Sequence, residues 1–346
     1  MSVNMAVSEN FLSSYRGSDD DFGLYGPNSV WNRAALTSQQ GDPFCCLAEW
    51  QMSYHDVFEP NRAIFARESA GNALAFAVIR VGGTPRGLVP LDDMWRFGNP
   101  LLGPNAVDLF ADTLPGLFAK WGGDASYIRI SGIRPHGRLL RELKTRFGNS
   151  YRFARYERDV QCGASLQGGI DGFLSRRSGN FRRKLKKTLR NAAQVGIQIE
   201  RHVPSAPSQA EEIYQRMLSV ELASWKGKGH CGMADGRCRP YYLLMLRRLS
   251  VSASGRIMFA VHDGKDIGFI FGGKAGSVYR GQQFSYDENW RDASIGNVLQ
   301  FSQLEWLCEE GASRYDMGPL CGRGMEYKQH WTEKRFWIET WSMTKD

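Results

Sequence analysis

The stretch YDENWRDASIGNVLQFSQLEWL, from Tyr286 to Leu307, decides the fold of this chain. A strand-like run ends here, a short polar loop follows, and a helix begins near Ser294 or Gly296. A helix N-terminus presents unpaired backbone N–H groups and a partial positive charge, which suits a phosphate. Gly296 allows a ligand to approach closely, and Arg291 adds a charged donor. The same residues also fit an ordinary strand-to-helix turn capped by Ser294.

Strands and helices alternate on both sides of this junction. Before it, three antiparallel strands are predicted, with a tight hairpin turn at Asp263-Gly264-Lys265-Asp266 between the first two. The expected strands of this half cover 197–202, 256–263, 266–276, 277–289, 313–318 and 335–343. The expected helices cover 207–225, 240–250 and 297–311.

The first half of the chain has a similar but shorter order of elements, without any sequence repeat. The pair Gly82–Gly83 separates two strand-like runs and indicates a hairpin. The expected strands cover 63–69, 73–81, 86–91, 126–133 and 151–160. The expected helices cover 107–122 and 136–148.

A strongly basic segment, SRRSGNFRRKLKKTLRNAAQVG at 175–196, joins the two halves. Phe181, Leu185 and Leu189 recur every four residues, so the segment is predicted to be an amphipathic helix packed on one face. Ser178 or Asn180 can cap its start. The favoured role is structural, with a solvated basic face. The alternative is that some of its cations border a cleft and attract an anionic donor or acceptor.

The composition is typical of a globular protein, and the chain is long enough for two domains. The 346 residues are 42% hydrophobic and 23% charged, and the formal net charge of +8 permits an anionic partner. No segment approaches the roughly 20 apolar residues that span a bilayer. The first thirty residues, rich in Ser, Asp and Gly, are expected to be a flexible leader without an export signal.

The cysteine pattern predicts a cytoplasmic protein with reduced thiols and without a metal site. The number of cysteines is odd, at seven, and several lie in apolar contexts. His230, Cys231 and Cys238 cluster in the sequence, but the spacing of the two cysteines is not that of a zinc site.

The junction resembles the phosphate-binding element of the GNAT superfamily of N-acetyltransferases. That superfamily binds the pyrophosphate of coenzyme A at a strand–loop–helix with the pattern Q/R-x-x-G-x-G/A. Here the pattern falls on Arg291-Asp292-Ala293-Ser294-Ile295-Gly296, in which Ser294 replaces the first glycine. The resemblance implies that acetyl-coenzyme A or another acyl-coenzyme A binds at Arg291, Ser294, Ile295, Gly296 and Asn297.

A second resemblance covers the chain beyond the leader. It is similar to the double-domain acetyltransferases called CelD/BcsL-like, which are related to the Fem-type aminoacyl transferases. The features that carry it are VPL at 89–91, FLSRRSGNFRRKLKKTLR at 173–190, ELASWKGKG at 221–229, FSYDENWRDASIGNVLQ at 284–300 and YDMGPLCGRGMEYKQHW at 315–331.

This resemblance implies an α/β fold of mixed, largely antiparallel sheets flanked by helices, in two tandem GNAT-like domains. The N-terminal domain is expected at 31–165, after a leader at 1–30. The C-terminal domain is expected at 166–346 and carries the acyl-donor site.

Acyl transfer to an amine in a ternary complex needs a polarised carbonyl, a proton acceptor for the amine and a proton donor for the leaving thiolate. The resemblance makes Tyr327 the candidate donor. Candidate bases are Asp316, Glu221 and Asp287, each of which also fits a capping or hydrogen-bonding role. The side chains expected to contact the substrates are Trp225, Lys226, Tyr286 and Lys328.

Three functions follow from these observations. The leading hypothesis is an acyl-coenzyme A-dependent N-acyltransferase acting on a small metabolite or amino sugar. The second is a Fem-like transferase using aminoacyl-tRNA, favoured by the basic segment because phosphate neutralisation dominates nucleic-acid affinity. The third, a non-catalytic nucleic-acid-binding protein, predicts aromatics among the basic residues, but Phe181 lies on the apolar face. The acceptor, acyl chain and oligomeric state stay open.

Overall fold

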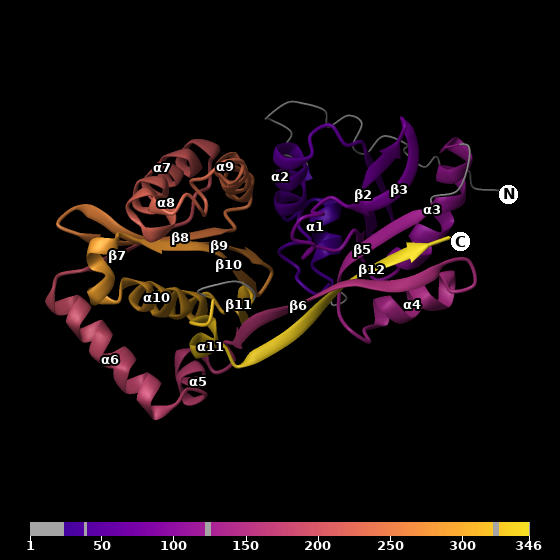
Figure 1. Ribbon diagram of the computed structural model, residues 1–346. Helices are drawn as coiled ribbons and strands as arrows, with labels where there is room; N and C mark the ends of the chain where they lie inside the picture. The colour runs from indigo at the N-terminus through magenta and orange to yellow at the C-terminus, as the bar shows by residue number, and fades with distance from the viewer. Residues whose placement is uncertain (1–23, 38–39, 122–125, 321–324, 346) are drawn as a thin grey trace. The chain divides into compact units, whose positions relative to one another are not determined.

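The computed structural model describes residues 24–37, 40–121, 126–320 and 325–345 (Figure 1), so most of the leader expected at 1–30 lies outside the described residues. The chain divides into two compact units: Met1–Arg158 with Ile338–Asp346, and Asp159–Trp337. Both consist of largely antiparallel strands flanked by helices, which confirms the expected fold class.

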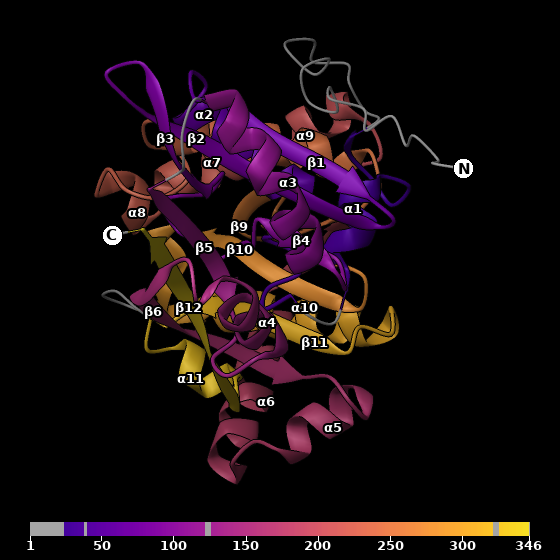
Figure 2. The ribbon, with the colours of Figure 1, turned by 90° about the vertical axis from the view of Figure 1, so that its right-hand side faces the viewer.

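The first unit is a sheet with two helices packed on one face. Its strands are β1 (Ile64–Ser69), β2 (Asn72–Val81), β3 (Thr84–Pro90), β4 (Leu101–Leu102), β5 (Tyr127–Ile133) and the end of β12 (Lys334–Thr344). Its helices are α1 (Val30–Ala35), α2 (Ala48–Phe58), α3 (Ala106–Trp121) and α4 (Arg138–Phe147). The strand order is β1-β2-β3-β5-β12, and α3 and α4 cover one face (Figure 2).

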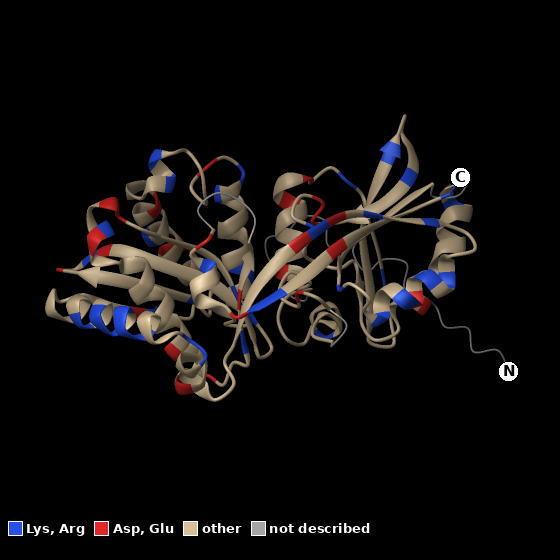
Figure 3. Cartoon of the chain, turned by 60° about the horizontal axis from the view of Figure 1, so that its bottom comes forward, with Lys and Arg blue, Asp and Glu red and all other residues tan. Residues whose placement is uncertain are grey.

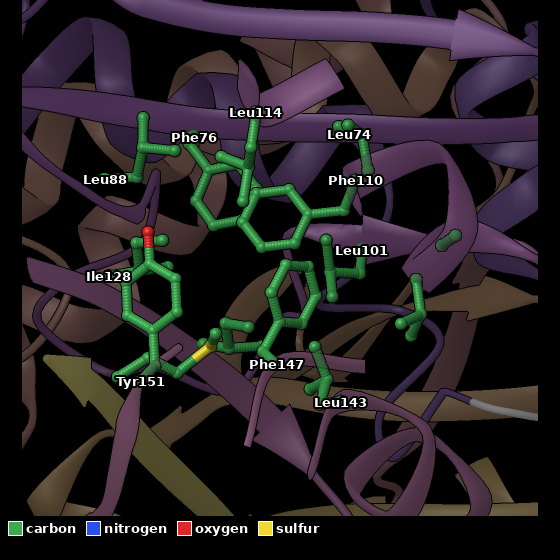
Figure 4. Packing of buried hydrophobic residues seen from close by; sticks show 14 of the residues in the cluster. Leu74, Phe76, Leu88, Leu101, Phe110, Leu114, Ile128, Leu143, Phe147 and Tyr151 are labelled. Atoms are coloured by element: carbon green, nitrogen blue, oxygen red, sulfur yellow. The ribbon is translucent and has the colours of Figure 1, made fainter. Parts of the chain in front are cut away.

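The core of the first unit lies between this sheet and the helices α3 and α4 (Figure 4). The rings of Phe76 on β2 and Phe110 on α3 stack at 5.2 Å, and Phe147 on α4 lies 5.6 Å from Phe110. β2 and β3 form the hairpin predicted at Gly82–Gly83, whereas β3 and β5 are parallel at Gly87↔Tyr127 and Leu88↔Ile128.

The second unit has helices on both faces of its sheet. The strands, in their order across the sheet, are β6 (Arg152–Ser165), β11 (Arg314–Pro319), β10 (Val278–Tyr286), β9 (Lys265–Ala275), β8 (Gly255–His262) and β7 (Gln198–His202). Helices α7 (Pro207–Ala223), α8 (Trp225–Lys228) and α9 (Cys238–Ser250) lie on one side (Figure 1). On the other side lie α5 (Gly169–Ser175), α6 (Gly179–Gln194), α10 (Ile295–Glu309) and α11 (Lys328–Trp331).

Two sequence predictions about local structure are confirmed in this unit. The turn between β8 and β9 has positive φ angles of 47° at Asp263 and 72° at Gly264, as two-residue hairpins require. The basic segment forms α6, where the Ser178 side chain caps the helix by accepting the N–H of Phe181 at 3.2 Å.

The compact units and the predicted domains divide the chain differently. Residues 338–346 were expected in the C-terminal domain, but they belong to the first unit because β12 pairs there with β5, for example at Trp341↔Ile130. β6 likewise begins in the first unit and ends in the second. Within the described part of the chain, no helix combines the length and apolarity needed to cross a membrane.

Candidate active site

The most distinctive feature of the second unit is the way β10 and β11 separate. They pair in parallel from Val278↔Arg314 to Arg280↔Asp316, where the pairing ends. Both strands continue beyond this point, and a register shift against β9 between Gly281 and Gln283 leaves Gln282 as a bulge. A bulge bends its strand and interrupts pairing, so the sheet opens between β10 and β11.

A cavity of about 590 Å³ lies at this opening. Its walls come from the second unit alone: β9, β10, the start of α10 with the loop before it, β11, α11 and the region of α8. Its volume is within the range of about 300–1,000 Å³ typical of small-molecule sites. The cavity therefore has space for a ligand in contact with both the helix start and the two strand ends.

The start of α10 supplies backbone donors to the cavity. Ser294 adopts a left-handed conformation, with φ of 56°, and its side chain makes no capping hydrogen bond. The Asn297 N–H already donates to the Ser294 carbonyl at 2.9 Å, so the amides of Ile295 and Gly296 are the first-turn donors that stay available to a ligand. Ser294, Gly296 and Asn297 line the cavity. Ile295, the remaining residue of this predicted set, has its side chain buried, so only its backbone can serve.

Gly296 keeps the space before α10 open. A Cβ atom here would lie 3.1 Å from the ring of Phe284 and 3.5 Å from the ring of Tyr286, so a larger side chain would displace the cavity wall. Arg291 also lines the cavity, from the 3-10 helix η2 (Glu288–Ala293) that precedes α10. Its guanidinium lies 3.4 Å from Glu288, which holds it at the loop.

Tyr327 lines the cavity next to α11, with its ring 5.3 Å from that of Phe284. Burial, and to a smaller extent the nearby Cys162, raise the pKa of Tyr327 well above its usual range. Its hydroxyl has no hydrogen-bond partner among the described residues. The phenol therefore stays protonated and is able to donate to a ligand. Lys328 lines the same wall, but its Nζ donates to the Pro319 carbonyl at 2.7 Å.

A buried carboxylate stands behind the other side of the cavity. Glu221, on α7, is fully buried and accepts hydrogen bonds from the Met233 N–H, at 3.0 Å, and from the Ser285 hydroxyl. Ser285 and Lys226 line the cavity, and Lys226 Nζ lies 3.7 Å from Glu221. Glu221 can therefore reach the cavity through Ser285.

Lys226 joins this carboxylate to a longer polar network. Its Nζ donates to Gln283 at 3.0 Å, and the Gln283 amide donates to the Tyr242 hydroxyl at 2.7 Å. Burial lowers the pKa of Lys226, although Glu221 acts against this shift. Near this cluster, Trp225 lines the cavity and has half of its surface exposed. Tyr286 lines the cavity at the end of β10.

Two of the predicted bases do not line the cavity. Tyr315 and Met317 on β11 face it, so Asp316, between them, points to the opposite face, where its carboxylate lies 2.8 Å from Arg314. Asp287 accepts the Asn289 N–H at 3.0 Å and caps η2. In this structure Asp316 pairs with a cation and Asp287 caps a helix, which are the alternative roles that the sequence allowed.

Other cavity residues were not predicted from the sequence. Gln282 lines the cavity at the bulge, and its Nε2 atom is buried without a partner among the described residues. Gln300 on α10 also lines it and accepts from the Tyr315 hydroxyl. Alternation along GQQFSY could have singled out polar inward positions, but the bulge changes the alternation at Gln282.

Among the residues that the structure describes, no three His, Cys, Asp or Glu side chains come together in a group that could hold a metal ion. Cys231 lines the cavity as a free thiol.

Comparison with known proteins finds a described domain family within the second unit. The model of the acetyltransferase (GNAT) domain family matches residues 179–329, which lie within the second unit. No curated protein matches this chain.

Several solved structures have a similar fold. FemX has a TM-score of 0.64 at 9% identity, over 89% of this chain and 94% of that chain. A conserved protein of unknown function from Bacteroides thetaiotaomicron VPI-5482 has a TM-score of 0.61 at 10% identity, over 99% of both chains. L-PGS from Bacillus licheniformis has a TM-score of 0.54 at 15% identity, over 89% of this chain and 93% of that chain. At these identities the likeness shows the fold alone.

Proposed function

We propose that this chain is an acyltransferase that transfers an acetyl or longer acyl group from acyl-coenzyme A to an amine, since its residues 179–329 match the acetyltransferase (GNAT) domain family. The acceptor is a small metabolite or an amino sugar. The observation that carries the proposal is the cavity between the diverging strands β10 and β11, at the open N-terminus of α10. We propose that the reaction takes place in the cytoplasm, where acyl-coenzyme A is available.

The residues at the start of α10 fit the phosphates of the donor. The amides of Ile295 and Gly296 supply N–H groups, the side chains of Ser294 and Asn297 line the site, and Arg291 contributes a positive charge. Gly296 also leaves room for the ligand. The acyl-bearing arm then occupies the gap between the strands. The free Nε2 of Gln282 is a donor for the thioester carbonyl, where negative charge develops during attack.

The chemical step is direct attack of the amine nitrogen on the thioester carbonyl. The new C–N bond forms, the C–S bond breaks, and the donor leaves as a free thiol once its sulfur has gained a proton. Tyr327 is the proposed source of that proton, because its hydroxyl is protonated, faces the cavity and is free of partners among the described residues. Solvent then reprotonates Tyr327.

The proton lost by the amine goes to Glu221. Since Glu221 lies behind the cavity wall, Ser285 relays the proton: its hydroxyl gives a proton to the carboxylate and takes one from the amine. Lys226, Trp225 and Tyr286 are proposed to orient the acceptor, together with Lys328 at the opposite wall. Asp316 and Asp287 have no part in this scheme.

The test combines donor binding with thiol release. Acetyl-coenzyme A and longer acyl-coenzyme A at millimolar concentration are expected to raise the melting temperature of the protein. A library of amines is then screened for release of the donor thiol. No thermal shift with any acyl-coenzyme A, together with no thiol release from any amine, overturns the proposal.

A second donor, aminoacyl-tRNA, is supported by the basic helix α6. It predicts tRNA binding that weakens steeply with salt and is lost on reversing Arg182, Arg183 and Lys187. Aminoacyl transfer from charged tRNA, with no turnover of acyl-coenzyme A, would replace the leading proposal with this one.

A further inference from the structure

Lys and Arg residues follow one another along α6 (Figure 3), and the exposed positions of this helix carry positive charge. The helix has sixteen residues and contains no acidic side chain. Its exposed cations are Arg182, Arg183, Lys184, Lys186, Lys187 and Arg190. We call this set the α6 ridge. The whole chain has a formal net charge of +8, so the six positive charges of this one helix are a large share of the excess.

The α6 ridge lacks the acidic partners that other cations of this unit have. Arg177 lies 2.6 Å from Glu333, and Arg216 lies 2.7 Å from Asp266. None of the six ridge cations forms an ion pair with any of the described residues. The ridge therefore presents an uncompensated positive potential, which attracts an anionic partner and accelerates its association.

The ridge is fixed in place by the buried side of the helix. The ring of Phe181 meets that of Trp331 edge-on at 5.2 Å, and Leu185 and Leu189 pack in the same hydrophobic cluster. The apolar residues of α6 are thus used within the protein. The exposed face offers charge, and its partner has to be recognised by charge.

The position of the ridge connects it with the donor end of the cavity. α6 packs along α10 and contacts η2, the two elements that supply the proposed phosphate site. In addition, the ring of Phe181 on α6 contacts that of Trp331, which lines the cavity. A large anionic partner on α6 is therefore next to the elements that hold the donor.

Building on the proposed function, we propose that the donor in the cell is an acyl thioester carried by a small acidic protein. The acyl group is borne on a phosphopantetheine arm, which is also the arm of coenzyme A and therefore fits the same cavity. The acidic surface of the carrier docks on the α6 ridge. The amine attacks the thioester carbonyl, the C–S bond breaks, and the arm leaves as a thiol still attached to its carrier.

The phosphate loop supports such a donor. The arm of a carrier holds one phosphate, whereas coenzyme A has a pyrophosphate and a further phosphate on its ribose. Here Ser294 stands where the family pattern has its first glycine, and Arg291 is held at Glu288. The loop therefore suits the single phosphate of a carrier arm, while the six cations of the α6 ridge, which have no ion pair with the described residues, lie on the neighbouring helix.

An acidic protein fits the ridge better than a nucleic acid or a membrane. Single-stranded nucleic acids are held by exposed aromatic side chains between cations, but the one aromatic residue of α6, Phe181, packs inward. Peripheral membrane helices insert an exposed apolar face, and that of α6 is buried. A membrane surface does not explain why the cations lie beside the proposed donor site, and binding of tRNA is one of the outcomes of the experiment below.

The experiment compares two donors in two matched variants. The first variant, R182E/R183E/K187E, reverses half of the ridge. The control, R80E/R86E/K120E, reverses three exposed cations of the first unit and changes the net charge equally. The donors are acetyl-coenzyme A and an acetylated bacterial acyl carrier protein, tested with the same amine. A neutral variant, R182Q/R183Q/K187Q, is included in case the reversal impairs folding.

We expect the ridge reversal to lower kcat/KM for the carrier at least about tenfold, because it removes electrostatic attraction. The neutral variant is expected to show a smaller loss in kcat/KM for the carrier. With acetyl-coenzyme A, kcat/KM changes less than about twofold in the reversed and the neutral variants. The control leaves both donors unaffected. Carrier-dependent turnover of the wild-type protein also falls with added salt, since exposed charges are screened.

Three results overturn the inference. One is turnover of acetyl-coenzyme A by the wild-type protein with none from the carrier, which leaves the proposed function intact. Another is an equal loss with both donors, which assigns the ridge to coenzyme A itself. The third is that the variant R182E/R183E/K187E keeps full turnover with the carrier but no longer binds tRNA or vesicles containing phosphatidylglycerol. That result assigns the ridge to a nucleic acid or a membrane. Failure of both donors with every amine instead removes the proposed function.

Discussion

The β3–β5 junction of the first unit and the β10–β11 junction of the second share a strand, a helix and a parallel strand in the same order, but differ in the segment before the helix. In each, a strand leads through a loop into a helix, and the next strand returns parallel to the first. In the second unit, the loop is the short segment 287–294 and the strands line a cavity. In the first, residues 91–105 form a longer connection that contains the short strand β4 and carries large apolar side chains.

Those side chains make the difference between the two junctions. Trp95 and Phe97, from the loop after β3, pack against Trp50 with ring centroids 5.4 Å and 6.5 Å away. Asp92 fixes them by accepting the Trp50 indole N–H at 3.0 Å and the Trp95 amide at 2.9 Å. Two parallel strands and the N-terminus of the helix between them are therefore not enough to form a donor site. The space between the strand ends and the helix also has to be free of side chains.

The largest expected effect comes from removing the aromatic packing of the first unit. Trp50→Ala deletes a side chain that is 3% exposed, and it takes a donor from Asp92. We expect a loss of about 3–5 kcal/mol in the free energy of unfolding, measured by urea titration with circular dichroism. Donor affinity is expected to be unchanged, since the proposed site is in the other unit.

Trp225→Ala is the matched control in the second unit. This residue is 50% exposed, so stability should change by no more than about 0.5 kcal/mol, while KM for the acceptor rises. Equal destabilisation by the two substitutions would contradict the contrast between a packed and an open junction.

The next effect concerns the glycine that keeps the second junction open. Gly296→Val brings methyl groups against Phe284 and Tyr286, which fills the space before α10. We expect kcat/KM for the donor to fall about 100-fold, since small misplacements at a reacting centre have that effect. Gly116→Val on α3 is the control, because nothing lies within 4 Å of its Cβ position. A similar loss in both variants would mean that the effect is on folding.

Tyr327→Phe tests the acid, and Tyr54→Phe in the first unit is its control. Burial raises the pKa of both hydroxyls, but only Tyr327 lines the cavity at β10–β11. We expect Tyr327→Phe to lower kcat about 100-fold with little change in donor KM, whereas Tyr54→Phe keeps full activity.

The raised pKa also gives the sign of the pH dependence. A tyrosine whose pKa is higher in the folded protein remains protonated at pH values where a free tyrosine ionises. The wild-type kcat should therefore not fall through pH 10 by ionisation of Tyr327. A rate that falls with an apparent pKa near 10, and no longer does so in Tyr327→Phe, would show that the hydroxyl is not shielded.

Much of this fold could be predicted from the sequence because its elements have strong periodicity. The hairpin turns at Gly82–Gly83 and Asp263–Gly264, the cap at Ser178 and the start of α10 all have local signals. The helix α2 was missed, since its residues are almost all buried and show no apolar stripe.

The roles of the acidic residues depended on contacts that local sequence does not encode. Asp316 ends up behind the sheet because alternation along β11 turns Tyr315 and Met317 to the cavity. Glu221 reaches the site through Ser285, 64 positions later in the chain. The bulge at Gln282 changes which polar side chains face inward. These are properties of strand register and tertiary pairing.

The smallest effect tests the proposed relay, which has no counterpart in the packed junction of the first unit. Ser285→Ala interrupts the path from the amine to Glu221 and is expected to lower kcat about tenfold, because water can replace the hydroxyl. Glu221→Gln alone should lower it more. If the two residues act in one path, the double variant is no slower than Glu221→Gln. Multiplicative losses in steady-state kcat would instead show that Ser285 and Glu221 act separately, and the base would have to be sought elsewhere along the cavity.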